Sequence, residues 1–194
     1  MDCGRFLDKS PFRPTLLGCV DEHPTTDDDG RFLCRLATGE TTAFAQLYER
    51  FGTRLYRAAM ALVGNREDAE DCVQEVFAAL VRSRQRLTEV QDLPAYLFAS
   101  LRRQAARSAE RRAQQPKILA SEPAAPEPPA DDSRGEAMRA ALESLNAEQR
   151  EVIALKVGGQ LTFKEIGRAL DISPNTAASR YRYALARLVD RMRK

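Results

Sequence analysis

Apolar residues recur every three or four positions in several separate segments of this chain. The first segment begins at Arg31, the second follows Thr41 or Thr42, and the third and fourth follow Asn65 and Pro94. This spacing places the apolar side chains of each segment on one face of a helix. Thr41 or Thr42 is the expected N-cap of the second helix and Asn65 that of the third, and Pro94 suits the first turn of the fourth.

A proline-rich stretch divides this helical pattern in two. Residues 116–133 carry five prolines and four acidic residues, a composition that forbids a helix and is typical of an extended linker. Beyond it, Leu142 and Leu145 begin a new helical repeat, which Gly158 and Gly159 interrupt. We find no segment in which apolar and polar residues alternate as they do in a strand. The sequence therefore predicts an all-α protein with two small helical domains joined by a proline-rich linker.

The last part of the chain has the pattern of a helix-turn-helix. Thr162 and Glu165 have the spacing of a capping box that opens a short helix, and Ser173 can cap the final helix after a tight turn at Asp171. In this motif the second helix lies in the major groove of DNA. A helical pair with a merely solvated basic face is the alternative. The outward side chains of the final helix are polar or basic for the most part: Asn175, Thr176, Ala178, Ser179, Arg180, Arg182, Tyr183 and Arg187.

The charged residues form blocks of opposite sign, although the net charge is only +2. Residues 82–117 carry +6 and residues 134–194 carry +5, whereas residues 118–133 between them carry −4. Residues 1–40 carry −3 and residues 41–81 carry −2. Two basic blocks around an acidic spacer indicate a bipartite contact with a polyanion, and the acidic first part suits a different partner.

Two further helices have charge patterns with more than one interpretation. The segment Ala95–Arg112 combines closely spaced arginines with Tyr96 and Phe98, as a surface for single-stranded nucleic acid requires, but a solvated arginine-rich helix has the same pattern. The segment Asn65–Glu75 is acidic. It suits either a solvated face or a protein partner with a basic surface.

Composition and motifs exclude several classes of protein. The longest apolar run near the middle, residues 58–63, is far shorter than the roughly 20 residues that span a bilayer. Residues 1–28 form an extension without a periodic pattern and without the apolar core of a secretory signal. The four cysteines are too widely spaced for a disulfide framework, so we expect a cytoplasmic protein. Cys19 and His23 are a weak metal pair, and no catalytic or nucleotide-binding motif is present. We therefore expect no metal, no cofactor and no catalytic residue.

Taken in order, these segments resemble the extracytoplasmic-function (ECF) sigma factors of the bacterial sigma-70 family. Residues 39–77 resemble the opening of the sigma-2 domain, residues 92–112 its promoter-melting end, and residues 141–188 the sigma-4 domain. The implied organisation is an N-terminal extension over 1–28, a sigma-2-like domain over 29–113, a linker over 114–135 and a sigma-4-like helix-turn-helix domain over 136–194.

The resemblance implies a sigma factor that binds core RNA polymerase and directs transcription initiation at promoters, and that is not itself an enzyme. The acidic helix would contact the clamp of the largest polymerase subunit through Asp68, Asp71, Gln74 and Glu75. The arginine-rich helix would recognise and melt the minus-10 element through Tyr96, Arg102, Arg103, Arg107 and Arg111. The outward residues of the final helix would read the minus-35 element.

Further implied partners are the polymerase flap and an anti-sigma factor, with no insertion into a membrane. The alternative function is a stand-alone helix-turn-helix transcriptional regulator whose N-terminal helical domain dimerises or senses a signal. That alternative needs no polymerase, and it leaves the acidic and arginine-rich helices without a role.

Overall fold

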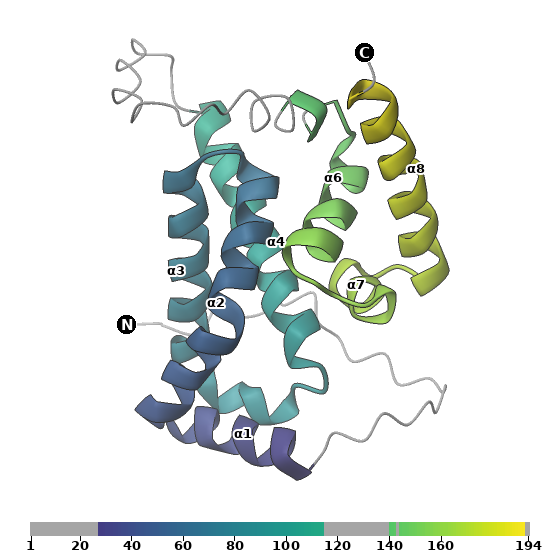
Figure 1. Ribbon diagram of the computed structural model, residues 1–194. Helices are drawn as coiled ribbons and strands as arrows, with labels where there is room; N and C mark the ends of the chain where they lie inside the picture. Colours follow the sequence, from purple (N-terminus) through teal and green to yellow (C-terminus); the bar gives the residue numbers. More distant parts are fainter. Residues whose placement is uncertain (1–26, 115–139, 143, 193–194) are drawn as a thin grey trace, which may run out of the picture.

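Two groups of helices make up the described structure. The computed structural model describes residues 27–114, 140–142 and 144–192 (Figure 1). Within these ranges every regular element is a helix, which confirms the all-α prediction. The proline-rich stretch 116–133 and residues 1–26 of the predicted extension lie outside the described residues.

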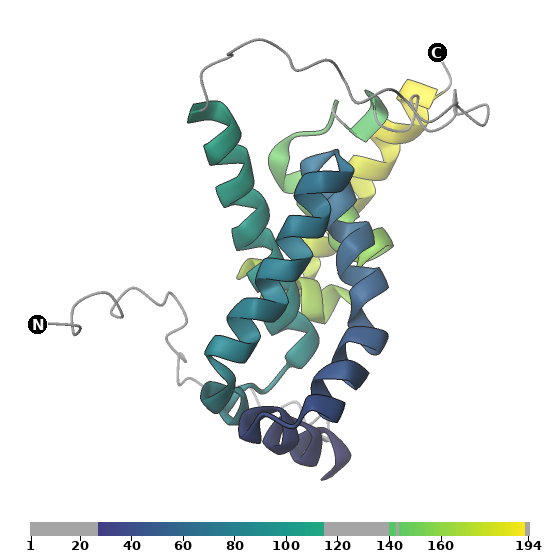
Figure 2. The same ribbon diagram turned by 90° about the vertical axis from the view of Figure 1, so that its left-hand side faces the viewer.

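The first group, here called the N-terminal unit, is a bundle of three long helices with a shorter pair across one end. Its elements are α1 Asp27–Thr38, α2 Thr41–Val63, α3 Arg66–Arg82, the 3-10 helix η1 Arg84–Glu89 and α4 Leu93–Gln114. Figures 1 and 2 show α2, α3 and α4 side by side, with α1 at one end of the bundle, where it packs against η1. The apolar stripes of the helices face inward, as their spacing predicts.

The second group, the C-terminal unit, contains the predicted helix-turn-helix. Its elements are α6 Ala147–Ile153, the π-helical turn η2 Ala154–Gly158, α7 Phe163–Leu170 and α8 Pro174–Met192. Asp171 makes the turn between α7 and α8 in the left-handed conformation, with a φ of 56°. A small core of its own lies between α6 and α8 and consists of Ala141, Leu145, Ile153, Ala184 and Leu188.

Side-chain caps begin two of these helices where the sequence predicts them. The Asn65 Oδ1 accepts a hydrogen bond from the Asp68 N–H at 2.9 Å at the start of α3. The Ser173 Oγ accepts one from the Thr176 N–H at 3.0 Å at the start of α8. Each cap satisfies a backbone donor that the first helical turn leaves without a partner, so the helix boundary follows from a local contact.

Capping boxes begin the two shorter helices. Thr162 and Glu165 form the predicted box at the start of α7, in which each side chain bonds the backbone of the other residue. Asn146 and Gln149 form a second box at the start of α6. The sequence analysis did not identify this second box, although its spacing is the same.

Two predicted helix starts are wrong. The first helix begins at Asp27, not at Arg31, so residues 27 and 28 belong to it and the predicted extension ends too late. Apolar periodicity marks buried positions only, and Asp29 and Gly30, which are exposed, therefore gave no signal. The N-cap of α2 is Glu40, neither Thr41 nor Thr42, and its side chain makes no cap hydrogen bond.

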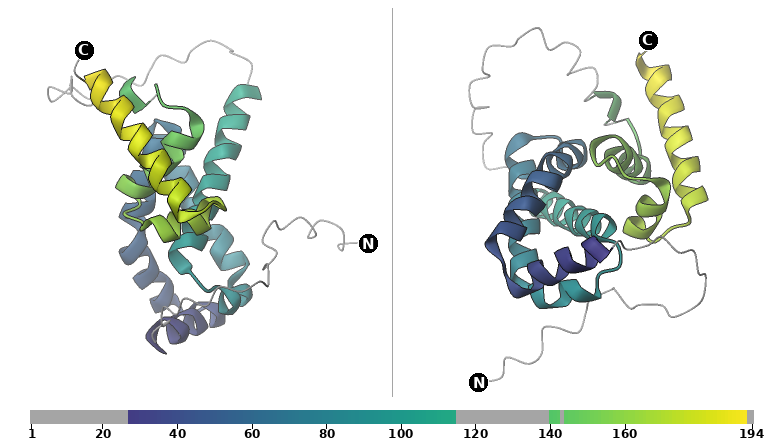
Figure 3. Two further views of the ribbon diagram at one scale, coloured as in Figure 1. Left: turned by 90° about the vertical axis from the view of Figure 1, so that its right-hand side faces the viewer. Right: turned by 60° about the horizontal axis from the view of Figure 1, so that its bottom comes forward.

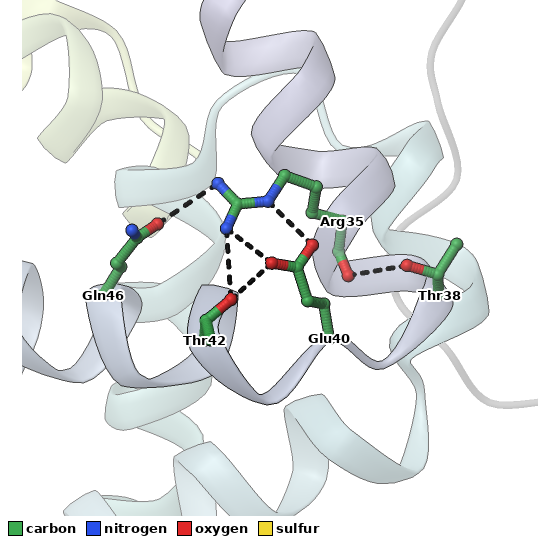
Figure 4. Close-up of polar contacts among 5 residues, drawn as sticks. All are labelled: Arg35, Thr38, Glu40, Thr42 and Gln46. Atoms are coloured by element: carbon green, nitrogen blue, oxygen red, sulfur yellow. Dashed lines mark hydrogen bonds and ion pairs between the residues drawn. The ribbon is translucent and has the colours of Figure 1, made fainter.

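The Glu40 carboxylate instead links the end of α1 to the start of α2 through hydrogen bonds (Figure 4). It accepts two hydrogen bonds from the Arg35 guanidinium, at 2.8 Å from Nε and 2.7 Å from Nη2. A further hydrogen bond comes from the Thr42 hydroxyl. These hydrogen bonds, that of Arg35 first, lower the pKa of Glu40 to about 2.

We expect Arg35→Ala to raise the pKa of Glu40 from about 2 toward its ordinary 4.5. A carboxylate with a lowered pKa stabilises the fold above its unfolded-state pKa, and this contribution is lost as the pH falls toward 2. A carbon-13 NMR titration of the Glu40 carboxyl measures the shift. Thr38→Ala is the control, because the Thr38 hydroxyl donates to the Arg35 carbonyl and its removal leaves the pair between Arg35 and the Glu40 carboxylate in place. An unchanged pKa in Arg35→Ala would contradict the assignment.

The two units share one hydrophobic core. Buried residues of η2 and α7, among them Leu155 and Ile166, join the same cluster as Leu55 of α2 and Leu97 of α4. Figure 1 shows α6 and α7 lying directly against the bundle of the N-terminal unit. The sequence predicts two domains, but it does not predict that one packs against the other.

Candidate nucleic-acid interface

The helix predicted to read duplex DNA lies on the outside of the molecule. Figure 3 shows α8 beyond α6 and α7, on the side away from the N-terminal unit. Helical spacing in the sequence predicts an inward stripe of Ala177, Tyr181, Ala184, Leu185 and Leu188 on this helix. Ala177, Ala184 and Leu188 are buried, but the prediction is wrong for Leu185, which is 37% exposed. One residue of helix turns a side chain by about 100°, which carries Leu185 away from the buried Ala184.

Most of the predicted reading residues of α8 are open to solvent. Tyr183 is 69% exposed, and Ala178, Ser179 and Arg180 are partly buried. The remaining members of the set are exposed: Asn175, Thr176, Arg182 and Arg187. A protruding aromatic ring among polar and basic side chains is suited to contact with base edges and phosphates.

The arginines Arg180, Arg182 and Arg187 of this surface have different hydrogen-bond partners. The Arg180 guanidinium pairs with Glu148 of α6 at 2.8 Å, and that of Arg187 donates to the Ser144 carbonyl at 3.1 Å. Arg182 donates to the Ser179 hydroxyl of its own helix at 3.2 Å. Arg180 and Arg187 are therefore anchored to other segments of the C-terminal unit, whereas Arg182 contacts a residue of its own helix.

A close crossing sets the direction of α8 relative to α7. A Cβ on Gly167 would lie 2.8 Å from the Ile172 carbonyl oxygen, which is closer than real Cβ atoms come. The rings of Phe163 and Tyr181 meet edge to face, with centroids 5.7 Å apart. Only a residue without a side chain fits at this crossing, so the turn that presents α8 requires Gly167.

The second basic surface lies on α4. Arg102, Arg103, Arg107 and Arg111 are all exposed, and Tyr96 is partly buried. Phe98 is completely buried, so it cannot stack on a base, and the suggestion that it belongs to a nucleic-acid surface is wrong. Phe98 follows Tyr96 by two residues and therefore faces the opposite side of the helix.

Arg103 lies against its own helix. Its guanidinium donates to the Ser100 hydroxyl at 2.8 Å. Partial burial lowers the pKa of Arg103, and the charges of Arg107 and Arg102 lower it further, whereas Tyr96 raises it. Arg102, Arg103 and Arg107 thus form a cluster of like charge on α4, whose mutual repulsion an anionic strand would relieve.

A groove between α3 and α4 brings two predicted sites together. It has a volume of about 640 Å³ and is lined by Asp71, Gln74 and Glu75 from α3 and by Arg107 and Arg111 from α4. Three of the four predicted protein-contact residues and two of the predicted DNA-contact residues therefore face the same groove. Acidic and basic walls at close quarters suit a partner that carries charges of both signs.

Asp68 has a different environment from the other predicted polymerase contacts. Its carboxylate accepts hydrogen bonds from the Asn65 amide at 2.6 Å and the Ser108 hydroxyl at 3.0 Å, and pairs with Arg112 at 3.0 Å. Burial raises the pKa of Asp68, but these hydrogen bonds and the Arg112 charge outweigh it, so the pKa lies below its ordinary value. The side chain joins α3 to α4, and it does not line the groove with Asp71.

We expect Asp68→Asn to destabilise the N-terminal unit by about 1–2 kcal/mol, because the variant loses a charge-assisted bond to each of two partners on α4. This difference in the free energy of unfolding between the variant and the wild-type chain is fully present above the unfolded-state pKa of about 4. It disappears as the pH falls through the lowered pKa of the native Asp68 carboxyl. Urea unfolding at pH 7 and pH 3 measures both effects. Asp71→Asn, at an exposed position of the same helix, is the control. Equal stability of Asp68→Asn and the wild-type chain at pH 7 would contradict this role.

Two features near these surfaces were missed by the sequence analysis. Tyr48 of α2 is 60% exposed, and the centroid of its ring lies 5.2 Å from that of Phe77 of α3. Arg54 of α2 reaches the C-terminal unit, where its Nε donates to the Gly159 carbonyl at 2.8 Å. Helical spacing alone predicts both aromatic residues as core and Arg54 as a surface charge.

The described residues hold no group of three or more His, Cys, Asp or Glu side chains that could bind a metal ion. Among the helices that the structure describes, none is both long and apolar enough to cross a membrane.

Family models match both units. The model of sigma-70 region 2 matches residues 47–115, and the model of sigma-70 region 4 matches residues 135–188. The first match covers most of the N-terminal unit with the acidic and arginine-rich helices, and the second covers the helix-turn-helix.

Curated relatives resemble most of the chain. The ECF RNA polymerase sigma factor SigE of Mycolicibacterium smegmatis is 31% identical over 81% of this chain, which spans 66% of the length of that relative. The ECF RNA polymerase sigma factor SigK of Mycobacterium ulcerans is 29% identical over 82% of this chain and 91% of its own length. The RNA polymerase sigma factor CarQ of Myxococcus xanthus is 30% identical over 75% of this chain and 87% of its own length.

Two solved structures share the fold at 22% identity. One is CnrH in complex with the cytosolic domain of CnrY, with a TM-score of 0.60 over 84% of this chain and 96% of that chain. The other is the sigma factor RpoE in complex with the anti-sigma factor NepR from Bartonella quintana, with a TM-score of 0.62 over 79% of this chain and 98% of that chain.

Proposed function

Because the chain belongs to the ECF sigma factors of the sigma-70 family, we propose that it binds core RNA polymerase and directs it to promoters. The polymerase carries out the chemistry, so the chain itself acts as a binding and melting factor, not as an enzyme. The observation that carries the proposal is the presence of two separate basic surfaces, on α4 and α8, beside an acidic face on α3. A stand-alone regulator is not favoured, because that function leaves residues 47–115, which match the model of sigma-70 region 2, without a role.

Each surface has a distinct proposed partner. The exposed α3 residues Asp71, Gln74 and Glu75 contact the clamp of the largest polymerase subunit, whereas Asp68 supports them by joining α3 to α4. The α4 arginines and Tyr96 bind the minus-10 element, and the outer face of α8 reads the minus-35 element. This division is supported by the exposure of α8 in Figure 3 and by the cluster of like charge on α4.

We propose the predicted domain boundaries with one change. The sigma-2-like unit starts at Asp27, where α1 begins, and ends at residue 113, and the sigma-4-like unit covers residues 136–194. Residues 114–135 connect them. The family-model matches at 47–115 and 135–188 support boundaries of this kind.

An anti-sigma factor is a further proposed partner. The structural neighbour RpoE is in complex with the anti-sigma factor NepR, and the neighbour CnrH is in complex with the cytosolic domain of CnrY. We place the proposed action of the chain in the cytoplasm, where core polymerase and promoter DNA are found.

Run-off transcription on genomic promoter fragments tests the proposed function. Core polymerase is incubated with and without the purified chain, and discrete transcripts that depend on the chain are the expected result. A chain that binds DNA fragments but neither associates with core polymerase nor yields such transcripts would instead support the stand-alone regulator.

A further inference from the structure

The groove between α3 and α4 has charged walls that do not pair with each other. Asp71 and Glu75 line it from α3, and Arg107 and Arg111 line it from α4. Glu75 pairs with Arg82 of its own helix. Asp71, Arg107 and Arg111 form no ion pair with any other residue of the described ranges 27–114, 140–142 and 144–192. Two basic groups and one acidic group are therefore available to a partner that enters the groove.

The same groove is a poor site for the minus-10 strand. Glu110 of α4 adds a third carboxylate to the lining, beside Asp71 and Glu75. These carboxylates outnumber the two guanidinium groups, so the groove as a whole repels the phosphates of a nucleic acid. A protein partner can present basic side chains to the carboxylates and acidic side chains to Arg107 and Arg111, and it can therefore satisfy both signs of charge.

The groove occupies only one part of α4. The groove residues of this helix begin at Gln104 and lie in its C-terminal half. Tyr96, Arg102 and Arg103 precede them and do not line the groove. Arg103 and Arg111 are eight residues apart, which is about 12 Å along a helix that rises 1.5 Å per residue. One helix can therefore contact nucleic acid with its first half and a protein with its second half.

We propose that Arg107 and Arg111 bind core polymerase and not DNA, and that they form the second wall of the site to which Asp71 of α3 belongs. The partner is a helical segment of the polymerase that carries basic and acidic side chains on one face. This assignment rests on the proposed function, in which α3 contacts the polymerase clamp. It narrows the minus-10 contact of α4 to the first half of the helix.

The uncharged lining of the groove also suits a polypeptide. Gln74 of α3 and Gln104 and Gln114 of α4 carry amides, each of which donates and accepts hydrogen bonds. Ala78 of α3 adds a small apolar side chain. A groove of about 640 Å³ with this lining can receive several side chains of one partner helix, both charged and neutral.

A charge reversal in the groove should separate binding of polymerase from binding of DNA. Arg111→Glu is expected to lower the affinity for core polymerase about tenfold, because an acidic side chain of the partner would then meet a like charge. It should bind a labelled single strand of random sequence within about threefold of the wild-type chain, because at 0.15 M salt the Debye length is only about 8 Å. Titration of labelled core polymerase and fluorescence anisotropy of the strand measure the two affinities of the full chain.

Arg103→Glu is the matched control, because it makes the same change of charge on the same helix outside the groove. It should weaken binding to the strand about tenfold and keep its affinity for core polymerase within about threefold. Arg107→Gln and Arg103→Gln form a second pair, in which a charge is removed and not reversed. Circular dichroism checks the helices of all four variants, and the second pair decides if a charge reversal disturbs the fold.

The outcomes separate this inference from the proposed function. If the groove variants keep their affinity for core polymerase, or weaken strand binding as much as the Arg103 variants do, the inference is overturned. Equal losses of polymerase affinity in both sets also overturn it, because general charge would then explain them. If the wild-type chain binds no strand, the polymerase affinities alone decide. If the wild-type chain does not bind core polymerase, the proposed function fails and the inference fails with it.

Discussion

Reversing one charge on α3, with Asp71→Lys, should weaken binding to core RNA polymerase at least tenfold. Asp71 is exposed and faces the groove between α3 and α4, so its replacement leaves the fold intact. A basic partner surface that the carboxylate attracts would instead meet a lysine, and like charges brought together at an interface cost several kcal/mol. Titration of labelled core polymerase with the variant measures the loss, and the melting temperature confirms the fold.

The matched control is the same charge reversal on a neighbouring helix. Glu49 of α2 is also an exposed carboxylate, but it does not line the groove. Glu49→Lys changes the net charge equally, so it measures the contribution of long-range attraction alone. Equal losses for the two variants would show that general charge, not the α3 face, governs the association. Unchanged affinity for Asp71→Lys would remove this face from the proposed polymerase contact.

The second large effect is expected on α8. Arg182→Ala should lower transcription from promoters with the preferred minus-35 element by about fivefold to a hundredfold, which corresponds to the loss of roughly 1–3 kcal/mol for a base-reading arginine. Arg182 is exposed and contacts Ser179 of its own helix, so its loss disturbs no packing. Discrimination at the minus-35 element should relax, because the remaining contacts with phosphates are the same for all sequences. The measurement is transcription by the holoenzyme from matched and scrambled minus-35 elements.

Arg187→Ala provides the comparison on the same helix. Arg187 lies farther along α8 and is held by the Ser144 carbonyl, a position suited to a phosphate contact at the edge of the interface. This variant should weaken binding to every sequence about equally, and it should lower the salt slope by about one phosphate contact. An equal loss from matched and scrambled elements in Arg182→Ala would show that Arg182 does not read a base.

Local chemistry explains what the sequence predicted well. The caps at Asn65, Thr162 and Ser173 satisfy backbone donors within three residues, so they are visible in a short stretch of sequence. The apolar repeat identifies the helices, and its breaks identify their ends within a few residues. The helix-turn-helix was predictable for the same reason, because the motif consists of two caps, a turn and one small residue, Gly167.

The side chains that were misplaced depend on neighbours distant in the sequence. Asp68 was predicted on an interface, but Ser108, forty residues away, draws its carboxylate toward α4. Phe98 was a candidate for base stacking, but the C-terminal unit covers it where Gly159 meets its ring. A helical repeat shows which residues share a face, and it cannot show which other helix that face will meet.

The sequence by itself determined that the chain is all-α, that it carries two basic regions around an acidic one, and that it ends in a helix-turn-helix, since helical period, caps and charge are properties of short segments. Only the tertiary structure decided that the two units share one core. It also decided that Gly158 and Gly159 lie at the contact between the units, whereas the sequence around them indicates only a break in a helix. The physical reason is that close packing selects for shape at the point of contact. Gly158 fits against the backbone of α2 and Gly159 against the Phe98 ring of α4 because both lack a side chain. Nothing in the sequence around the two glycines identifies these distant partners.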